Sequence, residues 1–96
     1  MPFISTFDFK FPANAHDQAV QITRSIGHDM TELDGYEHHE VIQDVTDPGH
    51  LMVNTRWAGL EKAQSVLDSY QHDQKIKQAE ALIPGGPQGF IGALLS

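Results

Sequence analysis

The sequence contains no cysteine, which excludes disulfide bonds, thiolate nucleophiles and thiolate metal sites. No apolar run approaches the about 18 residues that a membrane-spanning helix needs. The first ten residues also lack a basic segment followed by an apolar core, so no signal peptide is predicted. We therefore expect a cytoplasmic protein that is stabilised by packing alone.

Basic residues are scarce as well. The chain has six Lys and Arg residues and thirteen Asp and Glu residues, which gives a formal net charge of -7. Such a charge repels phosphate backbones and anionic membrane surfaces, and the basic residues are scattered along the chain. We expect neither nucleic acid nor a membrane as a partner, which leaves a small molecule, another protein or a second copy of the chain.

The length and composition fit one globular domain that covers residues 1–96. Apolar residues make up 40% of the chain and charged residues 20%, as in ordinary globular proteins. A domain of this size buries only about 60 to 65% of the surface that its unfolded chain exposes. Burial against a second subunit would therefore add usefully to its stability.

Four segments have the patterns of β-strands. Phe3–Phe11 alternates aromatic and polar residues, and Leu51–Trp57 is rich in β-formers. A strand from Tyr36 to about Asp44 and a short apolar strand over Gly89–Leu95 complete the set. The turn between the two middle strands is predicted at Asp47–Gly49, because Pro and Gly suit tight turns.

In the segments between these strands, apolar residues recur at the spacing that is typical of helices. Asn14 is expected to cap a first helix, which should fray near Gly27–Thr31. After Ala58 two helical pieces are expected, with a bend at Gln71–Asp73, and Pro84–Pro87 ends the second piece. The spaced apolar residues of the first helix are Ala15, Ala19, Ile22, Ile26 and Met30.

The element order predicts an α+β fold of the ferredoxin-like βαββαβ type, with a four-stranded antiparallel sheet and its helices on one face. Apolar residues also occur on the other face of the strands, such as Ile4 and Met52. Large apolar patches usually mark interfaces. We therefore predict a homodimer in which this second face packs on an identical sheet.

The segment Glu32–Ser69 resembles the antibiotic biosynthesis monooxygenase (ABM) domain family. The resemblance rests on Gly35-Tyr36, the Asp47-Pro48 turn, Arg56-Trp57 at a strand end, and Glu61 in the following helix. It implies a dimeric α+β barrel with a pocket in each subunit between the helices and the sheet. Some members of the family oxidise quinols or polycyclic phenols with dioxygen without any cofactor.

Other relatives in the resembled family cleave haem. They use an asparagine on the first strand and a histidine on the second helix. Here Thr6 stands near the first place, and His72 lies about a turn before the second. We therefore expect no cofactor.

The stretch Gly35–Val41, GYEHHEV, places two histidines between two glutamates. Alternation along a strand pairs His38 with Glu40 on one face and Glu37 with His39 on the other. Each pair could supply two ligands to a divalent metal, but a site needs a third ligand and no metal-binding spacing is present. The pattern favours two sets of polar positions and no metal centre.

A histidine can instead act as a general base, because its pKa lies near neutrality. Removing the proton of an electron-rich phenol gives an anion that can pass an electron to dioxygen. His38 is the first candidate and His39 the second. Asn54 could stabilise a developing oxyanion and completes the predicted catalytic set.

The predicted substrate-binding residues are aromatic or lie near the second helical region: Trp57, Tyr36, Tyr70 and His72. Trp57 could wall a pocket or lock helix to sheet as a core residue. It has the opposite parity to Asn54, so both can line one pocket only if the strand bulges. Tyr36 is expected on the face of His38, and Tyr70 on the apolar side of its helix.

The sequence and its resemblance together predict a cofactor-independent monooxygenase that acts on a small hydroxylated aromatic or quinol. Two alternatives remain. One is a non-catalytic small-molecule-binding or accessory protein of the same fold. The other is an enol isomerase that uses the same base without oxygen.

Overall fold

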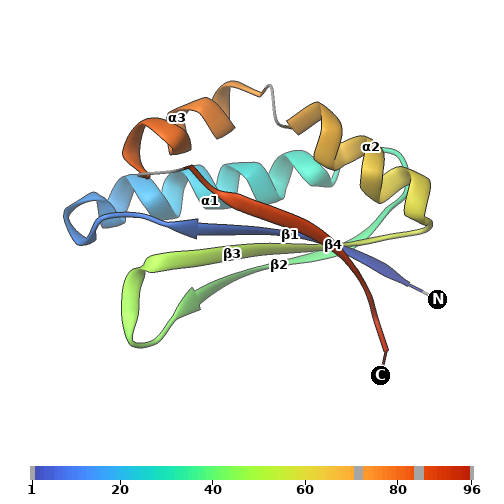
Figure 1. Cartoon of the computed structure of the whole chain (residues 1–96), viewed down its shortest axis with the longest axis horizontal. Coiled ribbons are helices and arrows are strands. Elements are labelled where there is room, and N and C mark those ends of the chain that lie inside the picture. The colour runs from blue at the N-terminus through green and yellow to red at the C-terminus, as the bar shows by residue number, and fades with distance from the viewer. Residues whose placement is uncertain (1, 71–72, 84–85, 96) are drawn as a thin grey trace.

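The computed structural model describes residues 2–70, 73–83 and 86–95. Its four strands form one antiparallel sheet, and the helices cover one face of this sheet (Figure 1). The order of strands across the sheet is β2-β3-β1-β4. The elements along the chain are β1 (Phe3–Lys10), η1 (Ala13–Ala15), α1 (His16–Met30), β2 (Tyr36–Asp44), β3 (Asp47–Trp57), α2 (Leu60–Tyr70), α3 (Gln74–Leu82) and β4 (Gln88–Ala93). This arrangement confirms the predicted ferredoxin-like α+β fold.

The core lies between the sheet and the helices. Alternation along β1 and β3 turns Phe9 and Val53 toward the helices, where both are fully buried. Phe9 stacks between Phe7 and Phe11, with ring centroids 6.3 and 5.9 Å apart. Residues from all three helices pack against this layer, among them Ile26, Met30, Ala63, Val66, Ile76 and Ala79. The aromatic face that the sequence predicted for the first strand is therefore the core face.

Helix α1 differs from its prediction at its start. Asn14 lies within η1, and no side chain caps the start of α1. The helix ends at Met30, within the predicted range Gly27–Thr31. A Cβ atom on Gly27 would lie 3.1 Å from His39 Cδ2 and 3.1 Å from Val41 Cγ2. Glycine therefore allows α1 to approach β2 closely, and this packing supports the last turn.

The β2–β3 hairpin turns earlier than the sequence predicts. Asp44 pairs with Asp47, so the turn is Val45-Thr46 and the predicted turn at Asp47–Gly49 is wrong. Gly49 lies within β3, where its carbonyl oxygen accepts a hydrogen bond from the Phe11 N–H at 2.8 Å. A Cβ on Gly49 would lie 2.3 Å from the Phe11 carbonyl oxygen. This glycine is needed for close approach between chain segments and not for the turn.

The second helical region consists of two helices, as predicted. Helix α3 begins after Asp73, whose carboxylate accepts a hydrogen bond from the Lys75 N–H at 2.8 Å and caps the helix. Gln71 and His72 of the expected bend, and Pro84 and Gly85 of the following loop, lie outside the described residues. Across the described ranges, no helix has the length and apolar character that crossing a membrane requires.

Candidate functional site

A hollow of about 420 Å³ lies on the helix-free face of the sheet. Two of the three predicted catalytic residues, His38 and Asn54, line it together. All four strands contribute, through Ile4, Thr6, His38, Glu40, Met52, Asn54, Arg56, Phe90 and Leu94. The strand register places His38 opposite Arg56 and Glu40 opposite Asn54. The predicted proton acceptor and the predicted oxyanion donor therefore share one cavity.

The charged side chains of the hollow gather on one side of it. Strands β2 and β3 supply a histidine, a glutamate, an asparagine and an arginine together with Met52, whereas β1 and β4 supply Ile4, Thr6 and Phe90. Phe90 is 60% exposed and Leu94, just after β4, is 42% exposed. A flat molecule with an apolar body and one polar edge matches this division.

A bulge in β2 changes the predicted pairing of the GYEHHEV residues. The register shifts between Tyr36 and His38, so Glu37 lies beside Arg56 and accepts a hydrogen bond from its Nε at 3.2 Å. His38 and Glu40 share a face, as predicted. The expected pairing of Glu37 with His39 is wrong, and so is the expected placement of Tyr36 on the face of His38, because strict alternation fails at a bulge.

Tyr36 and His39 instead face the helices, on the opposite side from the hollow. The Tyr36 hydroxyl and His39 Nδ1 share a hydrogen bond of 2.7 Å. The ring of Tyr36 meets that of Trp57 edge-on, with centroids 6.4 Å apart. His39, the second candidate base, therefore has a partner within the chain and does not join His38 in the hollow.

Trp57 is a core residue. It is fully buried, and its Nε1–H donates a hydrogen bond to the hydroxyl oxygen of Ser5 at 2.8 Å. Asn54 faces the other side of β3 and lines the hollow, in agreement with the opposite parity of the two residues. The indole N–H is thus satisfied by the core, and Trp57 and Asn54 do not line one pocket.

Two buried polar atoms of β3 have no hydrogen-bond partner among the described residues: Asn54 Oδ1 and Thr55 Oγ1. Buried polar atoms are nearly always paired in folded proteins, so an exception needs an explanation. In Asn54 the unpaired atom is the amide oxygen, an acceptor, whereas the oxyanion role expected of this residue uses its Nδ2 donor. Thr55 faces the helices and lies between Ser5 and His39 in the strand register.

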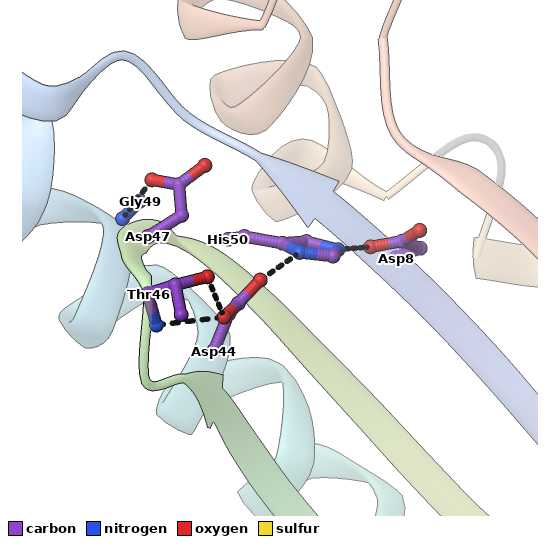
Figure 2. Close-up of polar contacts among 6 residues, drawn as sticks. All are labelled: Asp8, Asp44, Thr46, Asp47, Gly49 and His50. Atoms are coloured by element: carbon purple, nitrogen blue, oxygen red, sulfur yellow. Dashed lines mark hydrogen bonds and ion pairs between the residues drawn. The ribbon is translucent and has the colours of Figure 1, made fainter.

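A polar network that the sequence analysis missed lies beyond the hollow, toward the hairpin. Figure 2 shows the His50 imidazole between the carboxylates of Asp8 and Asp44. His50 Nε2 lies 2.6 Å from Asp8 Oδ1, and Nδ1 lies 3.1 Å from Asp44 Oδ2. Thr46 donates to Asp44 Oδ1 through its N–H and its hydroxyl, both at 2.8 Å. We call these four residues the His50 cluster.

The hydrogen bonds of the His50 cluster favour the protonated form of His50 and the ionised form of Asp44. The hydrogen bonds of Asp44 and then of Asp8 raise the pKa of His50 above 6.5. The Thr46 backbone N–H, followed by its hydroxyl and by His50, lowers the pKa of Asp44 to about 2. The one available signal in the sequence was that Asp8 faces away from the phenylalanines of its strand; the partnership with His50 depends on register between distant segments.

The remaining predicted site residues are not placed by the structure. His72 lies outside the described residues, and of Tyr70 only the backbone in α2 is described. Within the described part of the chain, no three His, Asp or Glu side chains are arranged to hold a metal ion.

Comparison with solved structures identifies the fold. The chain is similar to a candidate antibiotic biosynthesis monooxygenase from Deinococcus radiodurans, with a TM-score of 0.82 and 19% identity over 98% of this chain and 93% of that one. It is similar to another candidate from Nitrosomonas europaea, with a TM-score of 0.81 and 11% identity over 98% and 90% of the chains. It is also similar to SnoaB, a cofactor-independent oxygenase from Streptomyces nogalater, with a TM-score of 0.81 and 8% identity over 99% of this chain and 94% of that one.

The chain has the fold of the antibiotic biosynthesis monooxygenases. No protein-family model matches the sequence, and no curated protein matches it. The ABM fold that the residues around Gly35-Tyr36 and Arg56-Trp57 indicated is thus confirmed by the structure. The resemblance implied a pocket between helices and sheet, whereas the hollow that holds His38 and Asn54 opens on the helix-free face of the ABM sheet.

Proposed function

We propose that this protein is a cofactor-independent monooxygenase that oxidises a small hydroxylated aromatic or quinol with dioxygen in the hollow on its helix-free face. The observation that carries the proposal is that His38 and Asn54 line one hollow. The fold supports it, because proteins of this fold include one named a cofactor-independent oxygenase.

His38 is the proposed general base. Its side chain is exposed in the hollow and has no hydrogen-bond partner among the described residues, so its ring is available to a substrate. It takes the proton of the substrate hydroxyl and leaves a phenolate. The Asn54 amide lines the same hollow and stabilises the negative charge that this transfer creates.

The reaction balances without an external reductant. A phenol with a free ring position and one dioxygen give a quinone and one water. One oxygen atom enters the ring, and the other leaves as water with the hydroxyl hydrogen and the ring hydrogen. The substrate supplies all the electrons, and the first of them passes from the phenolate to dioxygen. The residues of the hollow have only to bind, deprotonate and orient the substrate.

A second copy of the chain is proposed to close the hollow. Phe90, Leu94 and Ile42 are 60, 42 and 42% exposed on or beside the helix-free face. Packing this face against an identical sheet would bury these residues and exclude water from the hollow, which strengthens the electrostatic interactions inside it. The homodimer and the cytoplasmic location expected from the sequence are parts of this proposal.

An oxygen electrode with a panel of quinols and naphthols tests the proposal. We expect the wild type to consume dioxygen with at least one of these compounds. His38→Ala should lose about a hundredfold or more in kcat, since a general base contributes at least that factor. His39→Ala is the matched control on the other face of the sheet and should retain most turnover.

Three outcomes would count against the proposal. Binding of a phenol with no oxygen consumption would indicate a binding protein or an enol isomerase. Loss of turnover in His39→Ala alone would place the chemistry on the helix side. Turnover that survives both histidine substitutions would exclude a histidine base altogether.

A further inference from the structure

The His50 cluster lies on the face of the sheet that the proposed dimer covers. His50 has the same parity along β3 as Met52, which lines the hollow. Asp8 has the same parity along β1 as Thr6, which also lines it. The register sets Asp8 opposite Met52, and Met52 opposite Ile42. A second sheet that packs over the apolar pair of Ile42 and Met52 would therefore cover the cluster as well.

Protonation of His50 decides the net charge of this cluster. With an imidazolium between them, the carboxylates of Asp8 and Asp44 leave one net negative charge, and with a neutral imidazole they leave two (Figure 2). The side chains of His50, Asp8 and Asp44 are 26, 39 and 33% exposed, so water still screens them in the single subunit. The hydrogen bonds of Asp44 and then of Asp8 hold the pKa of His50 above 6.5.

The other charged groups around the imidazole do not compete for it. Lys10 lies opposite His50 on β1 and is exposed. On the helix side, His16 Nδ1 lies 3.1 Å from the carbonyl oxygen of Pro48, and the Asp47 carboxylate accepts a hydrogen bond from a backbone N–H at 3.1 Å. Strand β4 has no charged residue. Among the described residues, the carboxylates that contact the imidazole are therefore those of the cluster itself.

We propose that the proton on His50 is a switch for the dimer, in which the two subunits hold together while His50 is protonated and separate when it loses this proton. The inference rests on the homodimer of the proposed function. Moving charge from water into an interface is costly, and the cost is greater for two net charges than for one. A two-fold interface presents the same cluster from both subunits, so the cost applies twice.

The sign of the pH dependence follows from this preference. Because the dimer favours the protonated form, the pKa of His50 is higher in the dimer than in the single subunit. The contribution of His50 to association is fully present at low pH and is lost as the pH rises through its pKa in the dimer. We expect the dissociation constant to rise at least about fivefold, the lower end of coupling between sites in proteins. Loss of the dimer would also open the hollow to water.

Analytical ultracentrifugation at a series of pH values from about 6 upward tests the switch. The dissociation constant of the wild type should rise along the series, while circular dichroism shows that the subunits stay folded. In His50→Gln the side chain is neutral at every pH, so the dissociation constant should be flat and as high as that of the wild type at the alkaline end. A wild-type value that returns in His50→Gln at low pH would overturn the switch.

Asp8→Asn distinguishes charge from structural support. This change removes one carboxylate and retains the shape of the side chain, so the dimer should be tighter than the wild type at the alkaline end of the series. If the cluster acted only by holding the hairpin in place, loss of its hydrogen bond to His50 would weaken the dimer instead. A weaker dimer in the folded Asp8→Asn variant would therefore refute the role of charge.

Two further histidines are the controls. His38 lies on the same face and lines the hollow, and His28 is exposed on α1. His38→Gln and His28→Gln should both retain the rise in the dissociation constant. A rise that disappears in His38→Gln and persists in His50→Gln would assign the switch to the wrong histidine and overturn the inference.

The switch and the proposed function fail separately. A wild-type dimer whose dissociation constant does not change along the series would contradict the switch and leave the homodimer standing. A pH-dependent dimer that consumes no dioxygen with the quinols and naphthols would support the switch and contradict the oxygenase. Single subunits at every pH would contradict the homodimer and the switch together.

Discussion

The contact between Ser5 and Trp57 joins the smallest polar side chain of the core to its largest aromatic one. Both residues are fully buried, and the indole N–H donates to the serine hydroxyl at 2.8 Å. Ser5→Ala would leave this N–H without a partner in the core. We expect the free energy of unfolding to fall by about 1 to 3 kcal/mol, measured by urea denaturation.

The control for Ser5→Ala is Ser65→Ala, at an exposed position of α2. It should change the free energy of unfolding by less than about 0.5 kcal/mol. A Ser5→Ala variant as stable as this control would mean that the indole N–H contributes nothing through Ser5.

Single residues also mark where sequence patterns succeed and where they fail. Alternation placed Trp57 and Asn54 on opposite faces of β3, and the structure agrees. It failed for Tyr36, because one extra residue at the bulge reverses every assignment before it. No local pattern shows a bulge, since the cause is the fit of β2 onto β3.

At the scale of elements, the β2–β3 hairpin shows how distant contacts override local turn signals. The sequence favours a turn at Asp47–Gly49, yet the chain turns at Val45-Thr46. Asp44 stabilises this turn through Thr46, and Gly49 is required where Phe11 approaches β3. The strands and helices themselves were predictable because their periodicity spans many residues, whereas this turn depends on two side chains and one remote strand.

The His50 cluster makes the attachment of this hairpin to β1 dependent on pH. The pKa of His50 is raised in the folded state, so its contribution to stability is fully present below about pH 6.5 and is lost as the pH rises through the folded pKa. We expect the free energy of unfolding of the wild type to fall relative to His50→Gln as the pH rises from 6.5 through the raised pKa of His50. Denaturation series across this range measure the difference.

The acid limb of the same cluster has the opposite sign. The pKa of Asp44 is lowered from 3.8 to about 2, so its contribution to stability is present above pH 3.8 and is lost as the pH falls toward 2.

The control for His50→Gln is the replacement of His28, an exposed histidine of α1, by glutamine, which should retain the wild-type pH profile. An alkaline decline that persists unchanged in His50→Gln would assign the pH dependence to another group.

At the scale of the molecule, the sequence predicted the element order and the apolar character of both sheet faces. Ile4, Met52 and Phe90 do line the helix-free face, where they meet the polar half of the hollow. The composition could not predict that four polar side chains of β2 and β3 gather in one place, because this depends on which strands are neighbours in the sheet. The candidate site is therefore a product of topology, while its individual residues were recognisable from their chemistry.

The proposed dimer gives this face its function, and Phe90 tests it. A glutamate at position 90 would place a charge in the apolar half of the interface, and burying an unpaired charge is costly. We expect the wild type to sediment as a dimer at micromolar concentration and Phe90→Glu to raise the dissociation constant roughly a hundredfold or more. Val45→Glu is the control, because Val45 is 97% exposed at the hairpin tip, away from the hollow. It should remain dimeric. A wild-type protein that sediments as a single subunit would leave the hollow open to water, and His38 would then lack the dry surroundings in which the proposed oxidation is favoured.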